Sequence, residues 1–297
     1  MKIGILTDTY SSITQAEAEK LGIHLLHMPF YINEETFYEG LDITTEEFVK
    51  KLESGATVTT SQPSPMDVTE FWDKALEEYD ELVYLPLSSG LSGSCETAIM
   101  LSQNERYEGK VFVVDNGRVS TPLHCTILDA LELVKEGYSA KQIQEMLKNA
   151  RDDMTIYIAV ETLEYLKRGG RITPAAAALG NVLNLKPVLK LATGKLDSFK
   201  KCRGFNKAKK TMIEAMKNDL ETRFKDAYAS GNLYLMAATS ASPEVTAAWV
   251  EEIKEAFPDM EVLCDQLPLG VFCHTGMGAL GIGCSVKPKR IYSFSIK

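Results

Sequence analysis

The chain has 297 residues, of which 45% are hydrophobic and 25% are charged, a composition typical of a globular protein with room for two domains. Its 32 basic and 41 acidic side chains give a net charge of -9, which opposes broad attraction to nucleic acid or to anionic lipid surfaces. Nucleic acid is therefore excluded as the main partner.

The N-terminal segment MKIGILTDTYSSI predicts a first strand, because its apolar run soon meets Asp8 and no small-residue cleavage site follows, unlike a signal peptide. No run approaches the roughly 18 apolar residues of a membrane span, and the longest candidate, PAAAALGNVLNL (174–185), resembles a buried helix. We expect a cytoplasmic protein without stable membrane insertion. The six cysteines form no C-x-x-C pair, so we expect reduced thiols and no metal site.

The first half alternates between apolar runs typical of strands and segments with helical periodicity. Predicted strands lie at 2–7, 24–32, 81–87 and 110–115, and predicted helices at 13–22, 45–55, 65–79, 95–103 and 123–137. Two helix starts are marked by capping residues, Ser64 before Pro65, and Ser139 with Gln142. The alternation predicts an α/β fold with a mainly parallel sheet and flanking helices.

The character of the sequence changes after TIYIAVETLEYL (155–166), where a Gly pair, two prolines and few charges follow. We therefore place a domain boundary near residue 160. The prediction is an N-terminal α/β domain at 1–160 and a C-terminal α/β or α+β domain at 161–297, without internal repeats.

The segment LPLSSGLSGSCETA (85–98) leads from a predicted strand into a helix. Ser92 stands where hydrolases expose a nucleophile, but the order Gly-Leu-Ser-Gly-Ser departs from G-x-S-x-G, and no phosphate-loop Lys follows. Free N–H groups at a helix start and the hydroxyls of Ser92 or Ser94 suit an anion. The alternative is that one of these serines only caps the helix.

A second hydroxyl-rich stretch, TVTTSQPSP (57–65), also precedes a helix. Thr60 and Ser61 are neutral donors, and together with Ser92 they would suit a carboxylate or a phosphate. The alternative is a connection stiffened by proline, with Ser64 as the cap of the following helix.

His274 is the preferred histidine for a site, because it begins HTGMGALGIG, where glycines permit close approach and few other polar side chains are present. His24 and His27 lie three apart in a predicted strand, which puts them on opposite faces and argues against a shared metal. The same string contains G-x-G-x-x-G, but too few residues follow Gly281 to complete a Rossmann unit.

Two basic segments stand out in the second half of this acidic chain. KRGGRI places Lys167, Arg168 and Arg171 around a Gly pair, typical of a helix C-terminus with favourable cations, with an anion site as the alternative. FKKCRGFNKAKK (199–210) is either a solvated face or a surface for docking an acidic protein partner, and in the docking interpretation Lys201 and Arg203 take part.

Six segments, TSQPSP, LSSGLSGS, YLKRGGRI, LKPVL, KCRG and HTGMGALG, in this order and spacing, resemble the DegV family of bacterial fatty-acid-binding proteins over nearly the whole chain. The resemblance implies two α/β domains that enclose one long-chain fatty acid in an apolar tunnel between them. It implies a non-catalytic lipid-binding protein without other cofactors. Some members carry the acyl chain for a fatty acid kinase, presenting the carboxylate to a separate kinase protein.

The resemblance also implies a set of carboxylate ligands: Thr60, Ser61, Ser92 and His274. From the same resemblance we expect Gly93, Ser94 and Thr275 as further contacts of this site. Two alternatives stay open, a serine-dependent acyl hydrolase that uses Ser92 and His274, and a carrier of a phosphorylated small molecule in the same site.

Overall fold

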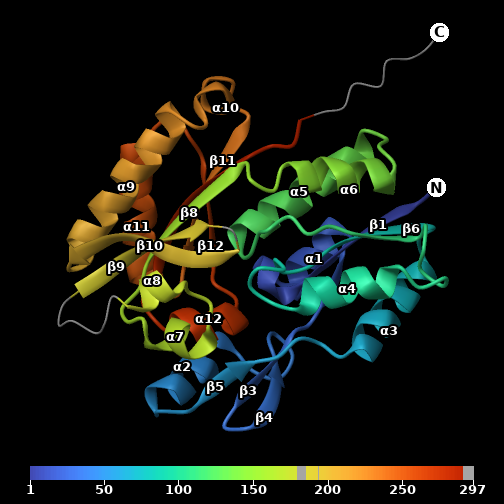
Figure 1. Ribbon diagram of the computed structural model, residues 1–297, viewed down its shortest axis with the longest axis horizontal. Helices are drawn as coiled ribbons and strands as arrows, with labels where there is room; N and C mark the ends of the chain where they lie inside the picture. The colour runs from blue at the N-terminus through green and yellow to red at the C-terminus, as the bar shows by residue number, and fades with distance from the viewer. Residues whose placement is uncertain (179–184, 193, 290–297) are drawn as a thin grey trace.

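The computed structural model describes residues 1–178, 185–192 and 194–289 of the chain (Figure 1). A parallel sheet forms the centre of the N-terminal part, with the strand order β2-β1-β6-β7. Its strands are β1 (Ile3–Asp8), β2 (His24–Leu26), β6 (Glu81–Leu85) and β7 (Val111–Val113). The mainly parallel N-terminal sheet predicted from the sequence is confirmed.

Helices cover both faces of this sheet. On one face lie α3 (Pro65–Leu76) and α4 (Ser94–Ser102), and on the other α1 (Gln15–Leu21), α5 (Thr121–Lys135) and α6 (Ala140–Asn149). The two faces follow from alternation along β1, because Ile5 packs with the α5 and α6 side chains and Leu6 with those of α3. Ser64 and Ser139 cap α3 and α6 as the sequence predicts.

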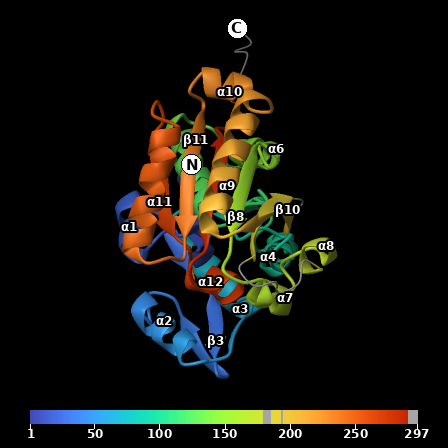
Figure 2. The same ribbon diagram turned by 90° about the vertical axis from the view of Figure 1, so that its left-hand side faces the viewer.

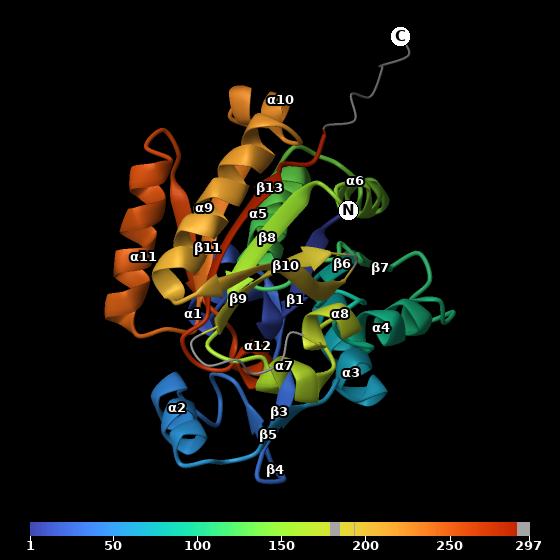
Figure 3. The same ribbon diagram turned by 60° about the vertical axis from the view of Figure 1, so that its left-hand side comes forward.

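A small antiparallel sheet lies at the bottom of Figures 1 and 3, in the order β4-β3-β5, beside α2 (Thr45–Glu53). Its strands are β3 (Pro29–Ile32), β4 (Glu35–Tyr38) and β5 (Val58–Thr60). The run 24–32, expected as one strand, is divided between β2 and β3. The two strands β3 and β4 turn at Asn33 and Glu34, which both have positive φ (48° and 72°), as a two-residue hairpin turn of the primed type requires.

The C-terminal part has a mixed sheet in the order β10-β9-β8-β13-β11-β12, in which only β11 and β12 pair in parallel among the described strands. Its strands are β8 (Met154–Ala159), β9 (Leu185–Ala192), β10 (Lys195–Arg203), β11 (Leu233–Thr239), β12 (Val262–Gln266) and β13 (Leu280–Val286). The outer face is covered by α9 (Phe205–Glu221) and α11 (Pro243–Ala256), side by side in Figure 2, and α10 (Lys225–Ala229) follows α9.

β8 already belongs to the C-terminal sheet, so the chain changes sheet between α6 and Met154, a few residues before 160. The division into domains at residue 160 stays a prediction. Within 174–185, expected as a buried helix, the structure has the short α8 (Pro174–Ala177) and the start of β9 at Leu185, and residues 179–184 lie outside the described part. Among the described helices, none has the length and apolarity to cross a membrane.

The helix α5 lies between the two large sheets and contacts β1 of one sheet and β11 and β13 of the other. Two more short helices, α7 (Glu164–Gly169) and α12 (Leu269–Thr275), join the small sheet to the C-terminal part. The ring of Phe48 packs edge-on against Phe30 and against Phe272 of α12, with centroids 5.7 Å apart in both pairs. This aromatic cluster fixes α12 beside the end of β5.

Candidate functional site

A cavity of about 330 Å³ lies between the two large sheets. Loops that follow β1 and β6 border it from one side, through Tyr10 and the segment 87–93, and the inner face of β8, β11 and β13 borders it from the other. The chain leaves β1 towards β2 on one side and returns to β6 on the other. Doubly wound sheets bind ligands at the carboxyl ends of strands where the chain reverses in this way.

Thr60 and His274 meet at one end of this cavity. Thr60 is the last residue of β5 and His274 lies in α12, and Thr60 Oγ1 is 2.9 Å from His274 Nε2. The contact joins residues that are 214 positions apart, and it depends on the packing of α12 against β5. Two residues singled out from separate motifs thus form one hydrogen-bonded pair that faces the cavity.

Ser92 borders the same cavity from the loop between β6 and α4. Its Oγ accepts the N–H of Ser94 at 3.2 Å, while the N-cap position of α4 is Gly93, which supplies no side-chain cap. Ser92 therefore contacts the first residue of α4 but does not occupy the N-cap position that the simpler interpretation of this loop expects. No acceptor for its hydroxyl hydrogen is found among the described residues, so the same hydroxyl can also donate into the cavity.

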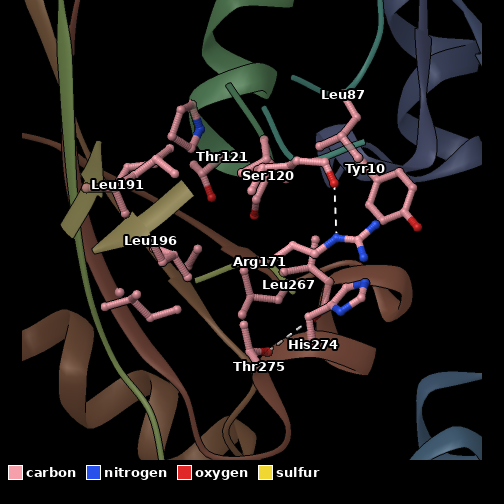
Figure 4. Close-up of a pocket in the computed structure, with 18 of the residues that line it drawn as sticks. Tyr10, Leu87, Ser120, Thr121, Arg171, Leu191, Leu196, Leu267, His274 and Thr275 are labelled. Carbon is pink, nitrogen blue, oxygen red and sulfur yellow. Dashed lines mark hydrogen bonds between the residues drawn. The ribbon is translucent and has the colours of Figure 1, made fainter. Parts of the chain in front are cut away.

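Arg171 is a lining residue that the sequence analysis did not include among the carboxylate ligands. Its Nε donates to the carbonyl oxygen of Leu91 at 3.1 Å (Figure 4), and its Nη1 donates to the carbonyl of Gly169. The Gly pair ends α7, with Gly170 at a φ of 70°, and the chain then turns so that Arg171 reaches the serine loop. The motif KRGGRI thus supplies a cation to the cavity.

The polar end of the cavity carries positive charge. Burial, followed by the nearby charges of Arg171 and Arg168, lowers the pKa of His274 to about 4, so its imidazole is neutral at pH 7. Figure 4 shows the guanidinium of Arg171 beside the ring of His274. One cation, one neutral imidazole and several hydroxyl groups form a site suited to an anion.

The rest of the cavity lining is mostly apolar. Its apolar side chains come from both halves of the chain: Leu87, Val119, Ile156, Ile158, Leu191, Leu196, Met236, Leu267 and Ile282. Gly281 and Gly283 line it from β13, where a Cβ would approach the carbonyl oxygens of Ala238 and Thr155 to 3.0 and 2.9 Å. A polar end joined to an apolar remainder fits an amphipathic ligand.

Comparison with known proteins places this chain in a family. The model of the DegV family, described as an uncharacterised protein family, matches residues 2–287. The chain belongs to the DegV family. A DegV domain-containing protein of Staphylococcus aureus strain N315 is 31% identical over 288 residues, which cover 95% of this chain and 97% of the relative.

Two solved structures show the same fold. A DegV family protein of Thermus thermophilus, described by its fatty acid binding, has a TM-score of 0.84 and 32% identity, covering 96% of this chain and all of its own. DegV of Bacillus subtilis, described as a fatty acid binding protein, has a TM-score of 0.84 and 26% identity, covering 97% of this chain and all of its own. The predicted resemblance and the α/β fold class are confirmed.

The remaining site residues predicted for this DegV-family chain differ in their placement. Ser61, Gly93 and Thr275 line the cavity, although the Ser61 hydroxyl donates to the carbonyl of Gln62 at 3.1 Å and the Thr275 hydroxyl to that of Val271 at 3.2 Å. Ser94 is only 2% exposed and lies outside the lining. Their roles as ligands stay predictions.

Proposed function

We propose that this protein binds a long-chain fatty acid in the cavity, with the carboxylate at the end formed by Thr60, Ser92, Arg171 and His274. The observation that carries the proposal is a cavity lined both by this positively charged group and by a mostly apolar remainder. The related proteins of Thermus thermophilus and Bacillus subtilis, described as binding fatty acids, support it.

Each part of the ligand has a matching part of the cavity. A carboxylate accepts hydrogen bonds only, and hydroxyl groups and a guanidinium are donors, so the bonds between them are charge-assisted. Burial of the acyl tail stabilises the complex by about 0.8 kcal/mol per methylene. The tail therefore supplies most of the affinity, and the head group sets the orientation.

Lipid analysis of the purified protein tests this proposal. Organic extraction followed by mass spectrometry is expected to yield free fatty acids, and the delipidated protein is expected to take up palmitate or oleate. Thr60→Val should weaken this uptake, while Thr59→Val, at the exposed neighbouring position of the same strand, serves as the matched control. A protein that is empty when purified and that does not bind added palmitate or oleate would refute the proposal.

We also propose that the protein presents the bound carboxylate to a separate fatty acid kinase, which docks on Lys201 and Arg203. Both side chains are exposed on β10, the edge strand of the C-terminal sheet. The same strand brings Leu196 to the cavity, so the basic edge and the ligand share one element. The six cysteines are free, which fits the reducing cytoplasm where we place this function.

Charge reversal separates docking from lipid binding. Lys201→Glu and Arg203→Glu are expected to lower the rate of acyl phosphate formation with a purified fatty acid kinase and to keep the Kd for the fatty acid. Lys141→Glu, at an exposed position of α6 in the other half of the chain, is the control. If the two β10 variants also lost lipid, the basic edge would be structural, and an unchanged rate would exclude it as the docking surface.

The geometry gives less support to a serine hydrolase. His274 Nε2 is bonded to Thr60 and not to Ser92, and Nδ1 has no hydrogen-bond partner among the described residues, whereas a catalytic triad needs a third group that orients the base. The apolar lining equally disfavours a small phosphorylated ligand. If a fluorophosphonate probe labelled the protein and the labelling were lost in Ser92→Ala, the hydrolase hypothesis would be favoured again.

A further inference from the structure

Gly169, the last residue of α7, lies directly against the imidazole of His274. A Cβ at Gly169 would overlap Nδ1 and would lie 2.7 Å from Cε1. Any side chain at this position would therefore push His274 away from Thr60. A Cβ at the neighbouring Gly170 would meet no atom within 4 Å, so the close approach belongs to Gly169 alone in this pair.

The atom of His274 that faces Gly169 is unusual. Nδ1 is buried and has no hydrogen-bond partner among the described residues. Glycine carries a hydrogen where other residues carry Cβ, so an α-hydrogen of Gly169 points at Nδ1. A nitrogen lone pair tolerates such a C–H contact, whereas an N–H in the same place would press two hydrogens together and leave a buried donor unpaired.

We propose that Gly169 is a positioning residue that holds His274 in the tautomer with a lone pair on Nδ1 and the hydrogen on Nε2. In this tautomer the Nε2–H donates to Thr60 Oγ1, at the observed 2.9 Å. The hydroxyl hydrogen of Thr60 is then free for the carboxylate of a ligand. In the opposite tautomer, Nε2 would accept that hydrogen, and Thr60 would turn oxygen lone pairs towards the carboxylate.

The surroundings of His274 agree with this assignment. The lowered pKa keeps the ring neutral at pH 7, so only one of its two nitrogens carries a hydrogen. Arg171 donates to the carbonyl of Gly169 and to that of Leu91, which fixes the glycine against the ring. Arg171 therefore holds Gly169, Gly169 sets the tautomer of His274, and His274 orients the hydroxyl of Thr60. The last step, donation to a fatty acid carboxylate, rests on the proposed function.

Nitrogen NMR tests the tautomer without any ligand. Protein labelled with 15N in its four histidines gives distinct signals for a protonated and an unprotonated ring nitrogen, and His274→Asn identifies the signals of His274. We expect hydrogen on Nε2 and none on Nδ1 at pH 7. Hydrogen on Nδ1, or on both nitrogens, would overturn the proposal. Because the sample is free of lipid, this outcome is independent of whether the protein binds fatty acids.

A pair of neighbouring variants tests the positioning role. Gly169→Ala is expected to displace the His274 signals and to raise the Kd for palmitate about tenfold or more, since a hydrogen bond to a charged group is lost. Gly170→Ala introduces an unfavourable left-handed alanine at a φ of 70° without touching His274, so it should lower stability but keep the Kd and the signals. Unchanged signals and Kd in Gly169→Ala would refute the role. If Gly169→Ala does not fold, the nitrogen NMR measurement of the His274 tautomer in the wild-type protein tests the proposal instead.

Discussion

Replacement of Arg171 by methionine is expected to weaken the binding of a free fatty acid and to spare that of its methyl ester. Methionine keeps an unbranched apolar stem but removes the guanidinium that lies beside His274 (Figure 4). The ester retains the tail and a carbonyl oxygen but has no negative charge. The difference between the two ligands therefore isolates the contribution of the charge.

The expected size of the loss follows from the partial burial of Arg171. Two opposite charges about 4 Å apart attract each other by about 4 kcal/mol at an effective dielectric constant near 20, before desolvation is counted. After desolvation, a hydrogen bond to a charged group contributes about 1.5–3 kcal/mol. At 1.4 kcal/mol per factor of ten, the Kd for the free acid should rise about 10- to 150-fold.

Titration calorimetry with oleate and with methyl oleate measures this effect, and Arg168→Met is the matched control. Arg168 lies over the ring of Tyr165, 5.3 Å from its centroid, and lowers the pKa of His274 as Arg171 does, but it does not line the cavity. Both variants should raise the pKa of His274 above about 4, and only Arg171→Met should change the Kd. An equal loss for acid and ester, or an unchanged Kd for the acid, would refute the reasoning.

Three other variants probe the fold around the cavity. Burial lowers the pKa of His124, but the hydrogen bond and charge of Asp265 and the charge of Glu17 outweigh it, so the pKa is raised overall. The protonated His124 therefore stabilises the fold fully below about pH 6.5, and this contribution is lost as the pH rises through the raised pKa of His124. In urea unfolding, His124→Gln should remove this pH dependence of the free energy of unfolding. In Gly90→Ala the new Cβ would overlap the Cα of Gly194, so the free energy of unfolding should fall by about 1–3 kcal/mol in the same urea assay. An unchanged free energy of unfolding would show that the two glycines are not in contact. Met236 pairs with Gly283, the cavity-lining residue of β13 that is farther from α12. Met236→Ala should therefore lengthen the saturated fatty acid that binds best in a competition assay. If the order of affinities for the different chain lengths stayed unchanged, the tail would lie elsewhere.

Local signals in the sequence were sufficient for the parallel sheet and its helices. Ser64 and Ser139 act within one turn of their own helices, so their roles do not depend on the rest of the fold. The small sheet is different. Pro29 interrupts the run 24–32 and begins β3, and pairing with distant partners then places the two parts of the run in two different sheets. The residues Asn33 and Glu34 form the turn of the hairpin between β3 and β4, a local feature that the expected single strand did not include.

The candidate site shows the same limit. Thr60 and Ser92 stood out as hydroxyl donors before helix starts, although each loop also had a simple structural explanation, and His274 stood out in a glycine-rich string. The family resemblance joined the three residues. Arg171 was missed as a ligand because a cation at a helix C-terminus already explains the motif locally. Its contact with Leu91, 80 positions away, depends on how the two large sheets face each other. The apolar lining depends on the same arrangement.

Several of the contacts that join the two halves of the chain lie around the cavity itself. The backbones of Gly90 and Gly194 touch, Arg171 bonds the carbonyl of Leu91, and Thr121 Oγ1 donates to the carbonyl of Ala237 at 3.1 Å. Arg171 therefore has two roles in the proposed complex, because the guanidinium that bonds the serine loop also lines the cavity. A bound carboxylate would add negative charge at this junction and strengthen the contact between the halves. A ligand without that charge would fill the cavity and leave the junction as it is, which is why acid and ester should differ in stabilising the protein as well as in Kd.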